Sequence, residues 1–359
     1  MSSNMSTSSS SAKPDRIING IAPIRICDLG GWTDTWFAGH GTILNIGVYP
    51  YVDVQVAVFP RHVREHQITL HAENYGERYV VLPGSAEHVR HPLLEAAINE
   101  VLLPANVALE ITIFSDVPAG ASTGTSAAVT VALIGALDAL TPGRMTPHEI
   151  AYAAHRVETQ RLGLQSGIQD QLCSAYGGIN FIEMFHYPYA TVSQIRIPDA
   201  IWWELERRLA LIFLGRTHSS SAVHEQVIAA LEREGDASPR LEALRRCAIC
   251  ARDALYAGDF VALGRAMIDN TDAQRALHPA LVNADADAVI ALAREHGVLG
   301  WKVNGAGGEG GSLTLLCGPD ASANRALLRD IRRLSPLFQP IPIYLSRMGL
   351  RVWTTDWER

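Results

Sequence analysis

The chain has 359 residues, a mass of 39.0 kDa and 48% hydrophobic residues, which is enough apolar sequence for one large domain or two. A formal net charge of -7 and a pI near 6.0 argue against nucleic acid or an anionic membrane as partner, and favour a small-molecule ligand. The five cysteines are scattered and predict no disulfide framework.

Residues 1–14 are polar and Ser-rich. They contain no apolar segment that could act as a secretory signal, so we expect a disordered tail and a cytoplasmic protein. The rest of the chain has neither tandem repeats nor long linkers, and its length favours two domains over one.

The first ordered segment, residues 21–58, predicts two strands joined by a Gly-rich connection. Arg25 stands between two isoleucines of the first strand, and a charge between buried neighbours is costly unless it is paired or faces a cleft. Arg25, and Asp34 in the connection, are therefore candidate functional residues. A structural salt bridge is the alternative for each, whereas His40 before Gly41 is more typical of a loop.

Residues 107–140 predict a strand, a turn of small residues and a buried helix. Every residue of 119–126 is Ala, Gly, Ser or Thr, so the backbone can approach a ligand closely. The helix expected over 127–140 is too short to span a bilayer, and the N–H groups at its start favour an anion. We infer a phosphate-binding loop, although an ordinary strand-to-helix turn is the alternative. It is not a Walker A sequence, since no lysine follows, and GxGxxG is absent.

A second polar cluster lies in residues 148–185, where Gly163 and Gly167 interrupt a helical pattern. Glu158 precedes this break and Asp170 follows it. A phosphoryl-transfer site without a Walker lysine needs a carboxylate for magnesium, and usually another to orient or deprotonate the acceptor hydroxyl. These two residues could supply both, but from the residues alone a helix cap or a surface charge explains each equally well.

The sequence after residue 185 predicts a helix-rich half, in which a helix between strands fits a split βαβ, ferredoxin-like domain. The serines after His218 suit a loop that caps a helix start. Cys247 and Cys250 have a CxxC spacing, which can bind zinc. They lie in an amphipathic helix with no second pair nearby, so we expect core packing and no metal there.

Together these segments resemble the GHMP small-molecule kinases. The first motif is APIRICDLGGWTDTW, the second, at 118–128, resembles PxGxGLGSSAA, and the third is KVNGAGGEGGSLTLL from Lys302. The GGWTD and GIQDQLCSAYGGINFIE wording, with the lysine before the third motif, is most similar to sugar kinases of the heptose 7-phosphate kinase and fucokinase branch.

The resemblance implies an α+β, two-domain GHMP kinase fold. A ribosomal-protein-S5-like N-terminal domain would occupy 15–190, and a ferredoxin-like C-terminal domain would occupy 191–359. It also implies ATP and Mg²⁺ as cofactors, a sugar as the substrate and a sugar 1-phosphate as the product, with a homodimer as a compatible assembly. The alternatives are a non-sugar alcohol such as mevalonate, or a catalytically silent sensor of sugar and nucleotide.

The resemblance implies residue roles as well. Asp170 would be the general base or the electrostatic orienter of the attacking hydroxyl, and Arg25 would offset charge at the transferred phosphoryl group. Glu158 would hold magnesium with a hydroxyl of Thr125 or Ser126. The implied ATP site comprises Pro118, Gly120, Ser122, Gly124, Thr125, Ser126, Gly305, Gly307 and Gly308, and the implied sugar site comprises Gly31, Thr33, Asp34 and Gly178.

The chain also departs from the family pattern. The second motif lacks GLG, and Thr125 replaces the usual serine with a stiffer, β-branched residue. Glu309 interrupts the third glycine run, and we expect its side chain to point away from the ligand. His218 stands where an arginine is often found, which puts a phosphorylated substrate in doubt.

Overall fold

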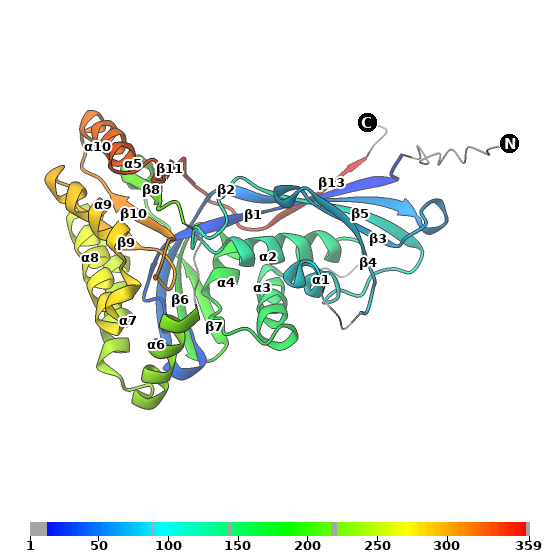
Figure 1. Ribbon diagram of the computed structural model, residues 1–359, viewed down its shortest axis with the longest axis horizontal. Coiled ribbons are helices and arrows are strands. Elements are labelled where there is room, and N and C mark those ends of the chain that lie inside the picture. Colours follow the sequence, from blue (N-terminus) through cyan, green and yellow to red (C-terminus); the bar gives the residue numbers. More distant parts are fainter. Residues whose placement is uncertain (1–12, 86, 88, 142–144, 217–220, 357–359) are drawn as a thin grey trace.

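The computed structural model describes residues 13–85, 87, 89–141, 145–216 and 221–356. Two sheets with their helices make up this part of the chain, the larger sheet on the right of Figure 1 and the smaller on the left. Both helices and strands are abundant in it, which confirms the expected α+β class. None of the described helices is long and apolar enough to cross a bilayer.

The larger sheet has nine strands in the described residues, and its main path is β13-β1-β2-β5-β3-β4. Its members are β1 (Arg16–Leu29), β2 (Gly41–Pro60), β3 (Ile68–Ala72), β4 (Glu77–Val81), β5 (Val107–Ser115), β6 (Ile179–His186), β7 (Tyr189–Gln194), β12 (Tyr344–Leu345) and β13 (Arg351–Asp356). The long strand β2 pairs with β6 through its first residues and with β5 through its last. The sheet therefore branches, and its two arms diverge from β2.

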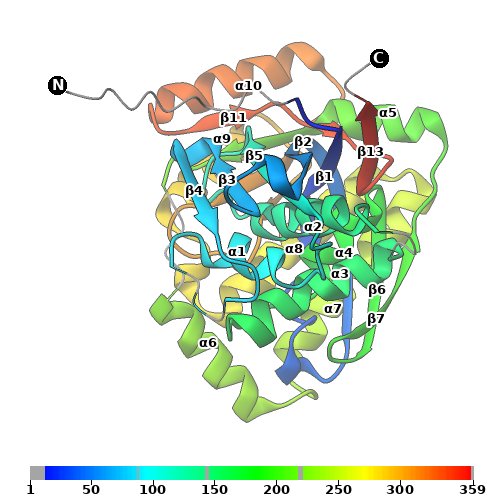
Figure 2. The same ribbon diagram turned by 90° about the vertical axis from the view of Figure 1, so that its right-hand side faces the viewer.

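Four helices lie against one face of this sheet, below it in Figure 1 and again in Figure 2. They are α1 (Pro92–Ile98), α2 (Thr125–Asp138), α3 (Pro147–Arg156) and α4 (Gln169–Tyr176). The central helix α2 is apolar almost all round, as expected for a core helix. It approaches β1 so closely that a Cβ atom on Gly20 would lie 2.8 Å from the Ala132 carbonyl oxygen. A capping box of Thr146 and Glu149 begins α3.

The smaller sheet has the antiparallel order β11-β8-β10-β9. Its strands are β8 (Leu209–Phe213), β9 (Gly300–Val303), β10 (Ser312–Leu316) and β11 (Gln339–Ile341). Numbered along the chain, this order is 4-1-3-2, and with α10 (Ala321–Leu334) between β10 and β11 it is the split βαβ arrangement that the sequence predicted. The remaining helices are α5 (Asp199–Arg208), α6 (Ser221–Glu234), α7 (Pro239–Ala257), α8 (Phe260–Leu277) and α9 (Ala284–Glu295).

Helices α7 and α8 join the two halves of the molecule. Buried residues of both helices, among them Ala248 and Met267, belong to the same hydrophobic core as the strands of the larger sheet. A separate core under the smaller sheet is formed with α9 and α10. Short helical turns complete the chain: η1 (Trp36–Ala38), η2 (Arg61–Val63), η3 (Glu73–Tyr75), η5 (Pro279–Leu281) and the π-helical turn η4 (Val157–Arg161).

The boundaries expected for the two domains need correction. Strand β7 continues the larger sheet past residue 190, and the end of the 191–359 segment returns to that sheet. Strand β12 pairs with β2, and β13 pairs with β1, with Arg16 opposite Asp356. This pairing satisfies backbone groups of β1 that would otherwise form an exposed sheet edge. The last strands therefore belong with the N-terminal half.

Candidate active site

The small-residue loop lies between β5 and α2, where its backbone is tightly constrained. Gly120, Ser122 and Gly124 have φ angles of 76°, 56° and 68°, in the left-handed region. Gly124 is the N-cap of α2, so the helix begins at Thr125, two residues earlier than expected. The first N–H groups of a helix have no intrahelical acceptor, and here they follow the loop directly. The structure therefore builds the backbone of an anion-binding turn.

Neighbouring segments hold this loop in place. The Arg25 backbone N–H donates to the Thr123 carbonyl oxygen at 2.9 Å, and the Arg25 guanidinium donates to the Ser122 carbonyl. On the other side, the Ser312 hydroxyl donates to the Ala121 carbonyl at 2.6 Å. Strand β1, the loop and strand β10 thus meet at one point, where the two halves of the molecule join.

A cavity of about 570 Å³ lies beside the loop. Pro118, Gly120, Thr125 and Ser126 line it, so the structure brings together four of the residues assigned to ATP. The rest of its wall is largely apolar or aromatic and includes Tyr75, His91, Pro92, Leu94 and Val129. An apolar hollow that ends at the start of a helix has the size and character of a nucleotide pocket.

The third motif contributes less than its glycines suggested. Gly305 packs against the loop, because a Cβ atom placed on it would lie 3.1 Å from the Ser122 Cβ. Gly307 and Gly308 instead face Leu281, whose carbonyl oxygen accepts the Gly308 N–H at 3.0 Å. These two glycines make the turn possible, and neither lines one of the two cavities of this site. Glu309 is exposed.

Arg25 and Asp170 form a bidentate ion pair at the centre of the site. Arg25 Nε donates to Asp170 Oδ1 at 2.7 Å, and Nη2 donates to Oδ2 at 3.1 Å. Arg25 is 4% exposed, and although burial opposes its charge, the carboxylates of Asp170 and Asp28 raise its pKa above the ordinary value. Asp170 lies in the first turn of α4, and a Cβ on Gly124 would stand 3.2 Å from its carboxyl group. The pair therefore borders the phosphate loop.

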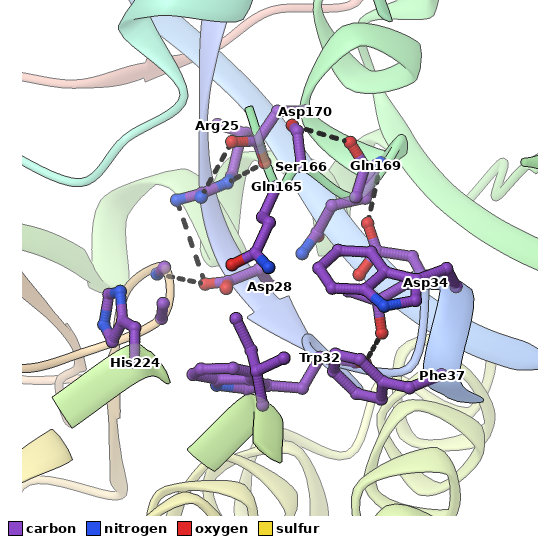
Figure 3. Close-up of a pocket in the computed structure, with 16 residues that line it drawn as sticks. Arg25, Asp28, Trp32, Asp34, Phe37, Gln165, Ser166, Gln169, Asp170 and His224 are labelled. Carbon is purple, nitrogen blue, oxygen red and sulfur yellow. Dashed lines mark hydrogen bonds and ion pairs between the residues drawn. The ribbon is translucent and has the colours of Figure 1, made fainter. Parts of the chain in front are cut away.

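A second, polar cavity of about 230 Å³ opens on the other side of this pair (Figure 3). Asp34 lines it and is 2% exposed, with its Oδ2 accepting the Gln169 backbone N–H at 3.0 Å. Burial, with the nearby charge of Asp170, raises the pKa of Asp34 to about 6. The other lining side chains include Trp32, Trp36, Phe37, Gln165, Ser166, Gln169, His224 and Ile228. Carboxylate, amide and aromatic groups thus share one small cavity.

Glu158 lies on the π-helical turn η4, behind Ser166. Its Oε2 accepts hydrogen bonds from the Ser166 hydroxyl at 2.6 Å and from Gln171 Nε2 at 3.0 Å. Burial is the main cause that raises the pKa of Glu158 to about 7, and the charge of Asp170 adds to it. Within the described residues, no cluster of three or more His, Cys, Asp or Glu side chains could hold a metal by itself. A metal here would need oxygens from a ligand as well.

Two charged residues, Asp28 and Lys302, belong to the site although sequence analysis assigned neither of them a role there. Lys302 Nζ lies 3.4 Å from Asp28 Oδ1 and 3.2 Å from Gln274 Oε1, and it contacts the Val303 carbonyl. Asp28 Oδ1 also accepts the Gly305 N–H at 3.1 Å. Both charged residues stand between apolar neighbours in sequence, which is the criterion that singled out Arg25. The same criterion, applied along the whole chain, also selects Asp28 and Lys302.

Three of the implied sugar-site residues lie outside the lining of the polar cavity. Thr33 is fully buried, and its hydroxyl donates to the Gly30 carbonyl at 2.7 Å, so it fixes the connection between strands. The Gly178 N–H donates to the Ser346 carbonyl at 2.6 Å, which ties it to the C-terminal segment. Gly31 packs against Asp28 behind the cavity wall. We therefore leave Thr33, Gly31 and Gly178 out of the proposed site.

Other residues discussed from the sequence lie outside the site or outside the described residues. Residues 1–12 of the expected tail, together with His218, Ser219 and Ser220, lie outside the described residues. On helix α7, Cys247 is buried and Cys250 is exposed, and both are free thiols. Cys247 packs in the core as expected, and its thiol donates to the Ala243 carbonyl at 3.1 Å.

Comparison with known proteins gives consistent matches. The family models described as GHMP kinases N terminal domain and GHMP kinases C terminal match residues 91–178 and 251–331. The D-glycero-alpha-D-manno-heptose 7-phosphate kinase of Campylobacter jejuni is 27% identical over 240 residues, which are 67% of this chain and 69% of that protein. A mevalonate kinase of Thermococcus sibiricus is 32% identical over 268 residues, or 71% and 73% of the two chains.

Two further proteins match this chain over different shares of their own length. The L-fucokinase/L-fucose-1-P guanylyltransferase of Bacteroides fragilis is 22% identical over 383 residues, but the match spans only 40% of that longer protein. The crystal structure of a D-glycero-D-manno-heptose 1-phosphate kinase from Bacteroides thetaiotaomicron superposes with a TM-score of 0.71 at 21% identity. It covers 94% of this chain and 98% of the other, so the two proteins share the whole fold.

Proposed function

The chain belongs to the GHMP kinase family of ATP-dependent small-molecule kinases, and from this premise we propose that it transfers the γ-phosphoryl group of ATP to a sugar hydroxyl. One observation carries the proposal. The Arg25–Asp170 ion pair borders the phosphate loop, and it also lines the polar cavity. A nucleotide and a small polar acceptor could therefore meet at this pair.

The larger cavity supports a role for the loop in binding ATP. The nucleoside would occupy the apolar hollow, and its phosphates would reach the start of α2, where backbone N–H groups and the helix dipole favour negative charge. The hydroxyls of Thr125 and Ser126 line the same hollow. Backbone groups and hydroxyls thus take the place of a Walker lysine.

The residue types proposed for magnesium are oxygen donors, as the ion prefers, although Glu158 lines neither cavity. Mg²⁺ prefers oxygen ligands, and it is commonly held by one or two carboxylates together with substrate phosphates. Glu158 and a hydroxyl of Thr125 or Ser126 would hold it, and when bound it would neutralise charge on the β- and γ-phosphates.

Asp170 is the proposed catalytic carboxylate. An acceptor hydroxyl in the polar cavity would donate its hydrogen bond to Asp170, which orients the oxygen toward the γ-phosphorus. As the new P–O bond forms, Asp170 receives the proton, the bond between the γ-phosphorus and the β,γ-bridging oxygen breaks, and ADP leaves with that electron pair. The guanidinium of Arg25 would hold Asp170 in position through two hydrogen bonds, and its positive charge would favour negative charge on the transferred group.

The cavity lining supports a sugar rather than mevalonate. Asp34 and Gln169 offer hydrogen-bond acceptors for several hydroxyls, and Trp32, Trp36 and Phe37 offer apolar faces for C–H groups. The names of the C. jejuni and B. fragilis relatives are those of sugar kinases. The fucose 1-phosphate in the second name supports the anomeric hydroxyl as the acceptor and a sugar 1-phosphate as the product.

The test is a coupled assay of ADP release with Mg²⁺ and ATP across fucose, galactose, arabinose, mannose, glucuronate, heptose 7-phosphate and mevalonate. Phosphorus NMR of each product would locate the phosphate. We expect at least one sugar 1-phosphate. Activity on mevalonate alone would overturn the proposed substrate class, and ATP binding without ADP release on any compound would favour the sensor alternative.

A further inference from the structure

We propose that the polar cavity takes a sugar that carries no anionic group, and that it rejects sugar phosphates and acidic sugars. This inference rests on the proposed sugar-kinase function and narrows its substrate class. It separates this chain from what the name of its C. jejuni relative would suggest, because that name specifies a substrate that is already phosphorylated.

The described lining of the cavity contains few cationic side chains. Arg25 is the only lysine or arginine among the described residues that line it. Its Nε and Nη2 donate to Asp170, and its Nη1 donates to the Ser122 carbonyl. These bonds use three of the five N–H donors of the guanidinium before a substrate enters, and they fix its orientation toward Asp170 and the loop. A phosphate group on the substrate would therefore have to share Arg25 with the Asp170 carboxylate.

Lys302 does not line the cavity, and all of its donors are engaged. An ammonium has three N–H donors, and Lys302 Nζ contacts three acceptors: Asp28 Oδ1, Gln274 Oε1 and the Val303 carbonyl. The segment 217–220 lies outside the described residues, but its sequence is Thr-His-Ser-Ser and adds neither lysine nor arginine. Arginine and lysine are the side chains that bind phosphate most strongly.

The side chains around the polar cavity carry more negative than positive charge. Asp28, Asp34 and Asp170 surround the cavity in Figure 3, whereas the cations beside them are Arg25 and Lys302. Three carboxylates and two cations leave an excess of one negative charge when all are ionised. A sugar phosphate brings about -1.5 to -2 further charges at pH 7, and these would be repelled in a site shielded from water.

Two residues of the cavity lining carry a buried polar atom that has no hydrogen-bond partner among the described residues. Gln169 is 7% exposed, and its Oε1 has no hydrogen-bond partner among the described residues. The indole N–H of Trp32 is also buried and unpaired within that part of the chain. Both residues line the cavity. A sugar hydroxyl can donate to Gln169 and accept from Trp32, whereas a dianionic phosphate can only accept.

The apolar part of the cavity wall also favours an uncharged sugar. Trp36, Phe37 and Ile228 are apolar or aromatic residues of the cavity lining. A charged group placed against such a surface would lose hydration without gaining hydrogen bonds. The C–H face of an uncharged sugar, or a methyl group on it, would instead gain from the contact.

The experiment compares matched pairs of substrates at constant pH and ionic strength. D-glycero-D-manno-heptose would be compared with its 7-phosphate, and galactose with galacturonate, by kcat/KM from ADP release. We expect the uncharged member of the preferred pair to exceed its anionic partner by about 100-fold or more, since unfavourable like-charge contacts cost several kcal/mol. An anionic partner that is used equally well or better would overturn the inference and leave the sugar-kinase function standing.

Failure of the proposed function would give a different result. Mevalonate would then be phosphorylated, and no sugar, charged or uncharged, would release ADP. The inference about sugar charge would fall together with the function in that case.

Charge variants test whether electrostatics causes the selection. Ile228→Lys adds a cation to the cavity wall and should narrow the ratio between uncharged and phosphorylated sugars by about tenfold, as a charged hydrogen bond would. The matched control is Ala229→Lys, which adds the same charge one residue away on an exposed position of α6. Asp34→Asn should also narrow the ratio, although it slows the uncharged sugar. A ratio unchanged in both Ile228→Lys and Asp34→Asn would contradict the electrostatic cause.

Discussion

The Asp28 carboxylate lies 3.4 Å from the Lys302 ammonium, and each side chain is only 1% exposed. Asp28 belongs to β1 in the larger sheet, and Lys302 belongs to β9 in the smaller one, so this buried ion pair joins the two halves of the molecule. Burial lowers the pKa of Lys302, and the charge of Asp28 counteracts that shift. Because Asp28 also accepts the Gly305 N–H, the pair helps to hold the third motif beside the phosphate loop.

Removal of one partner should be costly, because it leaves a buried charge without compensation. We expect Lys302→Met to lower the free energy of unfolding by about 3–5 kcal/mol in urea titrations. The double variant Asp28→Asn with Lys302→Met has no such charge and should recover much of that loss. Equal stability of the wild type and Lys302→Met would mean that the pair does not stabilise the junction.

Asp170→Asn keeps an amide oxygen as acceptor for Arg25, so the chain should still fold, with lower stability, while kcat falls by about 10²–10⁴-fold, the range expected when a general base is lost. ATP affinity should change little, because Asp170 does not line the nucleotide cavity. The matched control is Asp253→Asn on α7, where the side chain is 62% exposed and lines neither cavity. Unchanged turnover of Asp170→Asn would remove this residue from the mechanism.

Two glycines allow backbone strain to be separated from crowding of the site. Gly124 and Gly76 have nearly the same φ, 68° and 64°, so an alanine at either should cost about 1–2 kcal/mol. A Cβ on Gly124 would lie 3.2 Å from the Asp170 carboxyl group, whereas one on Gly76 would meet nothing within 4 Å. We expect similar losses of thermal stability in the two variants, but a loss of kcat in Gly124→Ala alone. Equal kcat values would show that the loop tolerates the added methyl group.

The raised pKa of Asp34 predicts a pH dependence. Its native pKa is about 6 against an ordinary value of 3.8, so its contribution to stability is complete below pH 3.8 and is lost as the pH rises through 6. The difference corresponds to on the order of 3 kcal/mol. Asp34→Asn has no carboxyl group to titrate, so it should not lose stability in this way. In urea titrations, the free energy of unfolding of the variant minus that of the wild type should therefore increase from pH 4 to pH 7.

The same titration should appear in catalysis. If ionised Asp34 accepts sugar hydroxyls, kcat/KM of the wild type should rise through pH 6, and Asp34→Asn should be slower and lack this limb. A limb of equal size in the variant would assign the titration to another group.

Several features could be predicted because their signals are local in sequence. The phosphate loop is a run of small residues between a strand of period two and an apolar helix, and the structure places it there. Arg25 stood out as a charge between isoleucines, and the structure pairs it with Asp170. The split βαβ half followed from the order of strands and helices, and the smaller sheet confirms it.

Other features depend on contacts between distant residues, which local patterns do not encode. Asp28 and Lys302 are 274 residues apart, and only the packing of β1 beside β9 brings them together. Gly178 belongs to a motif-like stretch, yet its backbone is paired with Ser346 and it lies away from the polar cavity. The return of β13 to β1 likewise reflects an edge that the preceding strands leave open.

By itself, the sequence determined the family, the two-part α+β architecture and the place of the small-residue loop between a strand and a helix, because backbone propensity and motif spacing are properties of short segments. The tertiary structure alone decided which charges neutralise one another and which polar atoms stay unpaired. Those outcomes depend on distances of a few ångströms between segments far apart in the chain. They leave Arg25 and Lys302 already engaged beside an acidic cavity, and on that balance of charge rests the proposed preference for a sugar without an anionic group.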